Sequence, residues 1–339
     1  MIVEGYEIIA ASLFIPRYAN ILESSLFVGV AIGSILALFI RNNLTSKLLS
    51  LTLMLSIILQ YLFTELALLA ILRFIIGVSF GALFLLSRDT SEKATITPIM
   101  WDVGAVLAGL VYIAFDPSMW NVGLALIAIL SVLILVDQVN ITVKSLPSRK
   151  KISRSMLIIT AIAGVAFEVL ATAESALNVT VISSYLKINP VELLIMTEIG
   201  IIIPSGLISS ILARRISLPS LQILGFLASS VALAFMLIFR SDVRIDLVIY
   251  LLANAFLQIG PGTTIYAQIF NTRRALAIES LVSNFTLAIV MFYPMDALLT
   301  LISISTLGGV FSILQLMANS KKELRKEERS VIAPIVVVR

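Results

Sequence analysis

The chain has 339 residues, of which 59% are hydrophobic and 13% are charged, and its mean hydropathy is +1.07. This composition excludes a soluble globular protein, and the lack of any long polar segment excludes an attached ATPase or other soluble catalytic domain. The sequence contains no histidine and no cysteine, which also removes most zinc, haem and thiol chemistry. The net charge is +4, but the sequence shows no domain that could bind nucleic acid. We therefore interpret the excess of basic residues as a signal of membrane topology.

Twelve apolar stretches follow one another along nearly the whole chain. A spanning helix needs roughly 20 predominantly apolar residues, and the lack of period-two alternation excludes a membrane β-barrel. The first stretch has no basic segment before it and no cleavage site after it, so we interpret it as a span. The sequence therefore predicts an all-α polytopic membrane protein with twelve transmembrane helices. The expected spans are residues 3–22, 24–41, 47–64, 66–87, 97–115, 119–138, 155–180, 192–213, 218–239, 246–268, 275–294 and 296–318.

Lysine and arginine are distributed unevenly between the loops that join these stretches. With the N-terminus in the cytoplasm, nineteen of the 24 basic residues fall in cytoplasmic loops or the C-terminal tail, and four fall in outer loops. The remaining one, Arg73, lies inside a span. Such a bias predicts a multi-pass protein of the plasma membrane with both termini in the cytoplasm.

The longest polar stretch in the interior of the chain runs from Gln138 to Arg154 and follows the sixth predicted span. It divides the chain into two six-helix halves, an arrangement typical of secondary transporters, whose solute site lies at the midplane between the halves. The predicted units are an N-terminal half, a cytoplasmic central loop, a C-terminal half and a basic cytoplasmic tail, at residues 1–138, 139–154, 155–319 and 320–339.

Three local patterns fall in the first, fourth and tenth predicted helices. They are Glu4-Gly5-Tyr6-Glu7, the spacing Arg73, Gly77 and Gly81, and Gly260-Pro261-Gly262-Thr263-Thr264 with the following pair Arg273-Arg274. They resemble the Asp-Gly-Tyr-Asp opening, the Arg-Gly pattern and the Gly-Pro-Asn-Thr-Thr segment of the major facilitator superfamily, closest to its sugar and metabolite:proton symporters. The resemblance implies two six-helix halves in the major facilitator fold and the activity of a secondary transporter.

The two cytoplasmic hinges depart from the family pattern. The hinge after the second helix carries Asn42 and Lys47 but no acidic residue, and Gln268 stands near the position of the family's glutamate after helix ten. We expect a weaker inside gate, or one held by amide hydrogen bonds. We also expect the Gly-Pro-Gly segment to interrupt helix ten in mid-membrane and free backbone groups there. The candidate gating and hinge residues are Asn42, Lys47, Gly260, Pro261, Gln268, Arg273 and Arg274.

Placing a charged side chain inside a membrane span costs free energy, so each such residue is a candidate for a functional role. Glu4 and Glu7 are spaced i, i+3 on one face of the first helix, where mutual repulsion and desolvation favour the protonated form of at least one. Glu7 is the deeper of the two, and Glu4 has the alternative of lying in headgroup water. Arg73 cannot lose its proton, so it needs a carboxylate partner on helix one, an anionic substrate or a water-filled cavity. Glu4, Glu7 and Arg73 are therefore the proton-coupling candidates, with a fixed structural ion pair as the alternative for Arg73.

The other intramembrane acids are Asp102, Glu168, Glu174, Glu198 and Glu279. Glu168 and Glu174 lie on different faces of helix seven, and we favour Glu174, which shares a face with Asn178. The polar residues of helix ten cover more than one face, so some of them are expected to bond neighbouring helices. The substrate-binding candidates are Glu174, Asn178, Asn254, Gln258, Thr263 and Thr264.

These observations predict a secondary active transporter, not an enzyme, which moves a small polar solute such as a sugar or an organic or inorganic anion. We expect alternating access with proton-coupled symport, a proton gradient as the energy source, no cofactor and no metal. The expected partners are the solute, protons and membrane lipids, with the chain as a monomer. Two alternatives stay open, a proton-driven drug or metabolite exporter of the same superfamily and a transporter-like sensor. An intramembrane lipid-processing enzyme is disfavoured because its usual cluster of Asp, His or Arg at one membrane face is missing.

Overall fold

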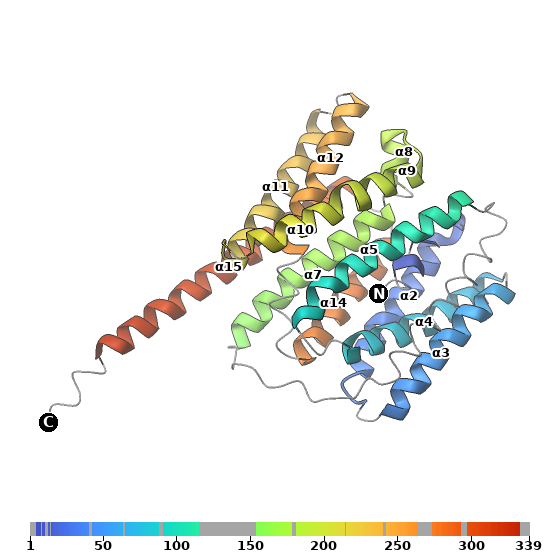
Figure 1. Ribbon diagram of the computed structural model, residues 1–339, viewed down its shortest axis with the longest axis horizontal. Coiled ribbons are helices and arrows are strands. Elements are labelled where there is room, and N and C mark those ends of the chain that lie inside the picture. The colour runs from blue at the N-terminus through green and yellow to red at the C-terminus, as the bar shows by residue number, and fades with distance from the viewer. Residues whose placement is uncertain are drawn as a thin grey trace.

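The computed structural model describes residues 5–7, 9–10, 13, 15–40, 43–63, 65–87, 91–114, 154–177, 181–213, 215–239, 242–262, 273–292 and 297–332 (Figure 1). Every regular element within these ranges is helical. The predicted span 119–138 lies outside the described residues, and the span 3–22 is described only in part, so the count of twelve helices stays a prediction. The all-α class is confirmed.

The described helices follow the predicted spans closely. Those before the central loop are η1 (Pro16–Tyr18), α2 (Ala19–Leu36), α3 (Asn43–Leu62), α4 (Leu66–Ser87) and α5 (Ser91–Ala114). Those after it are α7 (Arg154–Leu177), α8 (Ser183–Leu186), α9 (Pro190–Ile195), η4 (Met196–Ile202), α10 (Ile203–Leu212), α11 (Leu218–Phe239), α12 (Val243–Leu257), η5 (Gln258–Gly262), α14 (Arg273–Phe292) and α15 (Ala297–Ile332).

The predicted boundary between the first two spans, at Glu23, is wrong. Helix α2 runs through this position, and Glu23 is 2% exposed inside the bundle. The chain turns earlier, in the 3-10 segment η1, which begins at Pro16. Proline has no amide hydrogen to continue a preceding helix, whereas a single buried glutamate does not stop one.

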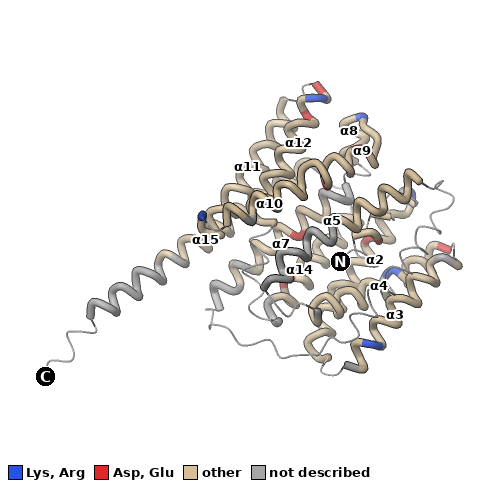
Figure 2. The backbone as a smooth tube through the Cα atoms, in the orientation of Figure 1, with Lys and Arg blue, Asp and Glu red and all other residues tan. Residues whose placement is uncertain are grey.

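Six of the described helical segments are long and apolar enough to cross a membrane: Ala19–Leu36, Leu66–Leu86, Pro190–Ser209, Leu218–Phe239, Val243–Gly262 and Leu298–Ala318. Many large apolar side chains on the outside of the bundle are exposed, among them Phe39 and Ile238 at 75% and 72%. Charged residues are sparse along the described backbone (Figure 2). An apolar outer surface of this extent fits a multi-pass membrane protein.

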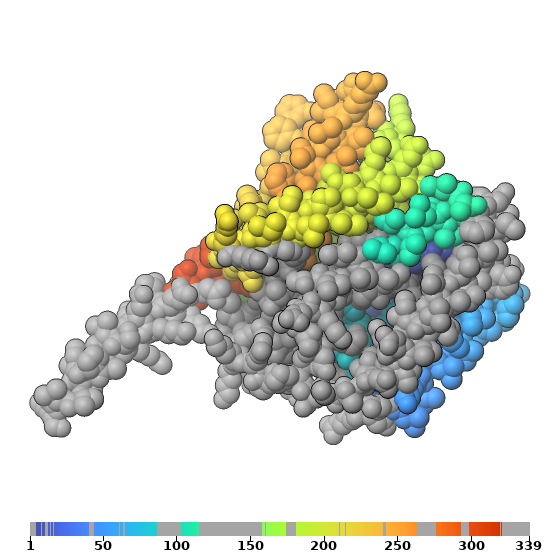
Figure 3. Space-filling view, in the orientation of Figure 1, coloured from blue at the N-terminus to red at the C-terminus, as the bar shows by residue number. Residues whose placement is uncertain are grey.

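Helices from the two halves of the sequence pack together. Helix α14 contacts both α2 and α7, and α5 contacts α9 and η4. In the space-filling view the surface of α5 adjoins that of the yellow-green segment containing α9 and η4 (Figure 3). Helix α11 contacts α12 and α15, and α15 extends away from the bundle (Figure 1).

The closest helix crossing joins α2 and α4 through glycines spaced by four residues on each helix. Gly29 and Gly33 of α2 lie directly on the backbone of α4, and Gly77 and Gly81 of α4 lie on the backbone of α2. A Cβ atom added to Gly29 would approach the Val78 nitrogen to 2.9 Å, and backbone atoms cannot move aside as a flexible side chain can. Small residues allow this approach, which is a common source of helix association in membranes.

We expect Gly77→Ala to lower stability, because its methyl group would overlap the α2 backbone at Leu26. Overpacking of this kind costs about 1–3 kcal/mol. The thermal unfolding midpoint in detergent measures the effect. The matched control is Gly200→Ala in η4, since nothing lies within 4 Å of the added atom there. Equal midpoints for the two variants would contradict the account of the crossing.

Candidate functional site

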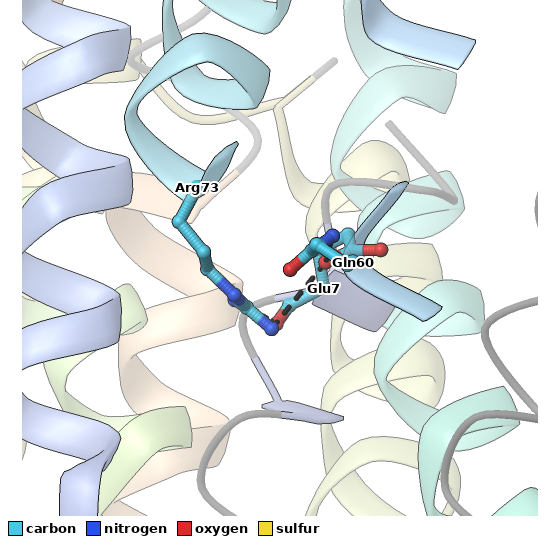
Figure 4. A network of polar contacts seen from close by, with 3 residues as sticks. All are labelled: Glu7, Gln60 and Arg73. Atoms are coloured by element: carbon cyan, nitrogen blue, oxygen red, sulfur yellow. Dashed lines mark hydrogen bonds and ion pairs between the residues drawn. The ribbon is translucent and has the colours of Figure 1, made fainter. Parts of the chain in front are cut away.

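A buried ion pair joins the first predicted span to α4. An Nη2 atom of Arg73 lies 3.3 Å from the Oε2 atom of Glu7, and both side chains are buried, at 1% and 0% exposure (Figure 4). Arg73 also donates through Nη1 to the backbone carbonyl oxygen of Glu7 at 2.6 Å. The guanidinium therefore contacts both the charge and the main chain of one residue. Of the surroundings predicted for Arg73, namely a carboxylate on the first span, an anionic substrate or a water-filled cavity, the structure shows the carboxylate beside it.

A third side chain completes this cluster from α3. Gln60 donates from Nε2 to Oε2 of Glu7 at 3.2 Å and is itself fully buried (Figure 4). Glu7, Gln60 and Arg73 thus converge from the first, third and fourth predicted spans. We call these three residues the Glu7 cluster.

The Glu7 carboxylate is held at one oxygen and open at the other. Oε2 contacts both Gln60 and Arg73, whereas Oε1 has no hydrogen-bond partner among the described residues. The amide oxygen of Gln60 and the hydroxyl of Tyr6 are likewise buried without a partner there. Buried polar atoms are nearly always bonded, so these atoms have the capacity to bond a further proton, water or solute group.

A second polar network crosses from α2 to α14 and α7. The hydroxyls of Ser34 and Ser280 lie 2.7 Å apart, and Asn284 donates to the Ser280 hydroxyl at 3.2 Å and to Oε1 of Glu168 at 3.4 Å. Further along the same two helices, Ser24 donates to the carbonyl oxygen of Ala288 at 3.0 Å. The bonds of Ser34 and Ser24 connect residues from opposite halves of the sequence along one seam, which we call the α2–α14 seam.

The Gly260-Pro261-Gly262 segment lies in the π turn η5, which is described as far as Gly262. Ser209 of α10 donates to the Ile259 carbonyl oxygen at 2.6 Å, so this wider turn is bonded to a neighbouring helix. Residues 263–272 lie outside the described residues, and the predicted interruption of helix ten stays a prediction. A second π turn, η4, lies in the eighth predicted span, residues 192–213, and π turns are frequent at functional sites.

Gln258 lies where η5 meets α10. A Cβ atom on Gly206 would come within 3.4 Å of its Nε2, and Gly262 lies against its Oε1. The two glycines therefore leave the space that this amide fills. Asn254, one turn earlier, is buried and donates to the carbonyl oxygen of Tyr250 in its own helix at 3.0 Å.

The structure describes only some of the remaining predicted site residues. Glu4, Asn42, Asn178, Thr263, Thr264 and Gln268 lie outside the described residues, and the side chains of Asp102, Glu174, Arg273 and Arg274 are not described. Lys47 is exposed on α3, whereas Glu198 and Glu279 are buried. Within the described part of the chain, no three acidic side chains come together as a metal site would require.

Comparison with known proteins identifies the fold. No protein-family model matches the sequence, and no curated protein matches it. The partially occluded inward-open structure of the xylose transporter XylE from E. coli superposes with a TM-score of 0.68 at 14% identity, over 93% of this chain and 94% of that one. A POT family transporter in complex with 5-aminolevulinic acid superposes with a TM-score of 0.63 at 14% identity, over 94% and 95%. The chain therefore has the major facilitator fold that its sequence patterns resemble, and these neighbours are transporters rather than enzymes.

The Glu7 cluster predicts unequal costs for removing its two charges. Glu7→Gln leaves a permanent cation buried without its counter-charge, which costs about 3–5 kcal/mol. Arg73→Met should cost less, because the carboxyl group left behind can become neutral by binding a proton. The double variant should regain most of the stability lost in Glu7→Gln. The free energy of unfolding in mixed micelles measures these differences.

The control for this series is Glu192→Gln, which removes an exposed carboxylate at the start of α9 and should change stability little. Equal losses from the two single variants, or no recovery in the double variant, would contradict a buried ion pair.

Proposed function

We propose that this chain is a secondary active transporter of the plasma membrane that moves a small polar solute together with protons by alternating access. The observation that carries this proposal is the fully buried Glu7–Arg73 pair within a fold shared with transporters. Arg73 is permanently charged, and Glu7 can bind or release a proton. The net charge of this buried pair therefore depends on one proton.

In this proposal Glu7 is the proton-binding group and Arg73 is its charge partner. When Glu7 is ionised the pair is neutral, and when Glu7 binds a proton at its open oxygen the guanidinium is left with a net positive charge. Arg73 stays in place in both states, since its bond to the backbone oxygen of Glu7 does not depend on the carboxylate. Proton binding therefore changes the electrostatic potential of the site without releasing the guanidinium.

The α2–α14 seam has the position expected of a gate between the two halves. Its bonds join helices of the N-terminal and C-terminal halves, and opening the solute site to one side of the membrane requires such helices to separate at that side. A hydroxyl pair is suited to this movement, because each serine can exchange its partner for water at small net cost.

The solute is proposed to be a sugar or an organic or inorganic anion. The solved neighbours include a xylose transporter and a protein in complex with 5-aminolevulinic acid, so this fold accommodates both chemical classes. Gln258 and Asn254 are the described candidates for contact with it, with Glu174, Asn178, Thr263 and Thr264 as further candidates from the sequence.

Proton coupling is tested in liposomes that contain the purified protein and a trapped pH dye. Addition of xylose, 5-aminolevulinic acid, phosphate or a simple amine on the outside should acidify the interior for one class of solute. Glu7→Gln should abolish that signal, and Glu192→Gln should retain it. Solute uptake with no change of pH would contradict proton coupling, and alkalinisation would indicate an exporter working by antiport.

Movement at the seam is tested with two cysteines. The natural sequence has none, so Ser34→Cys combined with Ser280→Cys introduces the only two thiols. Because the two hydroxyls are 2.7 Å apart, the thiols should form a disulfide on mild oxidation, which is seen as loss of maleimide labelling. Uptake should fall when the bond closes and return on reduction.

The control pair is Ser34→Cys with Ser230→Cys, because the Ser230 hydroxyl bonds Thr306 of α15 instead. That pair should keep both thiols free. Full transport through the closed Ser34–Ser280 disulfide would contradict a role for the seam as a gate.

A further inference from the structure

Gln60 is a buried amide with one of its two functional groups in use. Its Nε2 atom donates to Oε2 of Glu7 at 3.2 Å, and its Oε1 atom has no partner among the described residues. The side chain is fully buried in α3, so its amide oxygen does not reach bulk solvent. This oxygen is therefore available to accept a hydrogen bond from a group inside the bundle.

A carboxyl group needs different partners in its two protonation states. The ionised form only accepts hydrogen bonds, whereas the protonated form also donates one through its O–H. Arg73 carries donors alone, so it can satisfy the ionised form but cannot accept from the protonated one. The Tyr6 hydroxyl can both donate and accept, but it makes no hydrogen bond to Glu7 among the described residues, whereas Gln60 is already bonded to that carboxylate. Gln60 is the described partner of Glu7 that holds both a donor and an acceptor.

The conclusion rests on the proton-binding role proposed above for Glu7. We propose that Gln60 is a positioning residue that hydrogen-bonds Glu7 in both protonation states, donating through Nε2 to the ionised carboxylate and accepting through Oε1 from the protonated acid. The change requires the amide to turn about its terminal torsion. Because Oε1 of Gln60 has no other partner, this turn breaks a single hydrogen bond and forms another.

The chemical balance of the step is simple. A hydronium ion transfers one proton to a carboxylate oxygen of Glu7 and leaves as water, so one O–H bond forms on the carboxyl group. No covalent bond of Gln60 changes. The charged and titratable groups of the described residues near this carboxyl are Arg73 from α4 and the neighbouring Tyr6. Arg73 has no acceptor atom, and Tyr6 makes no hydrogen bond to Glu7 in the described part of the chain, so Gln60 is the proposed acceptor of the new O–H.

The consequence for transport is that Gln60 keeps the acid and the carboxylate in one position. Without it, the protonated acid would have a buried O–H with no acceptor, and the carboxyl group would turn toward whatever polar group or water it could reach. Loading and release of the proton would then occur in a less defined geometry, which lowers turnover more than it lowers solute affinity.

The test is the infrared difference spectrum between acidic and alkaline pH of the reconstituted protein, which needs no identified solute. The protonated Glu7 carboxyl gives a C=O stretch that should be absent from Glu7→Gln. In Gln60→Met, a variant of similar shape with no hydrogen-bonding amide, this band should move to higher wavenumber. Gln222→Met, which removes another fully buried amide in α11, is the matched control and should leave the band in place.

A second measurement uses the natural sequence, so it stands even if Gln60→Met does not fold. With isotope-labelled glutamine, acidification should shift one amide carbonyl to lower wavenumber as it accepts the acid O–H, and Glu7→Gln should abolish that shift. A Glu7 band that is unmoved in folded Gln60→Met, or the absence of an amide shift in the natural protein, would overturn the role of Gln60 alone. Absence of any Glu7 acid band would overturn the proton-binding role of Glu7, and the role of Gln60 with it.

Discussion

A guanidinium that cannot lose its proton is the constraint around which the N-terminal helices are arranged. Arg73 is 1% exposed and keeps its charge, so an acidic group must lie within contact distance to balance that charge. Glu7 meets that need from one side, and the glycine contacts between α2 and α4 fix the height and rotation of the helix that carries Arg73. Gln60 then closes the cluster from α3. One permanent charge thereby determines how three predicted spans are oriented.

The same arrangement explains what the sequence could predict. A charge inside a span is rare and costly, so Glu7 and Arg73 were identifiable from residue type and position alone. The four-residue spacing of Gly77 and Gly81 is also typical of a close helix crossing, and the structure has one at these residues. Helix positions followed from hydropathy, since α4 and α11 begin and end at the predicted residues.

The polar partners were not predictable in this way. Gln60, Ser280 and Asn284 are ordinary polar residues near the ends or along the length of apolar helices, and spans that are apolar on every side give no periodicity from which to read the inward face. Their roles depend on the rotation of each helix, which only the packing of the bundle sets. The π turn at Pro261 was not predictable for a related reason. Proline and glycine indicate a disturbed helix, but they do not specify a π turn, nor the bond that Ser209 of α10 makes to it.

The length of α15 has a practical consequence for imaging the protein. Its 36 residues make a rod of about 54 Å, well beyond the ~30 Å of hydrocarbon that its apolar part crosses. A membrane protein whose described residues form one helical bundle offers electron cryomicroscopy little by which to align particles. A rigid helical protein joined in phase at Ile332 would supply that feature. Each residue added at the junction would rotate the attached body by about 100° and advance it by about 1.5 Å, so its orientation could be chosen from sequence.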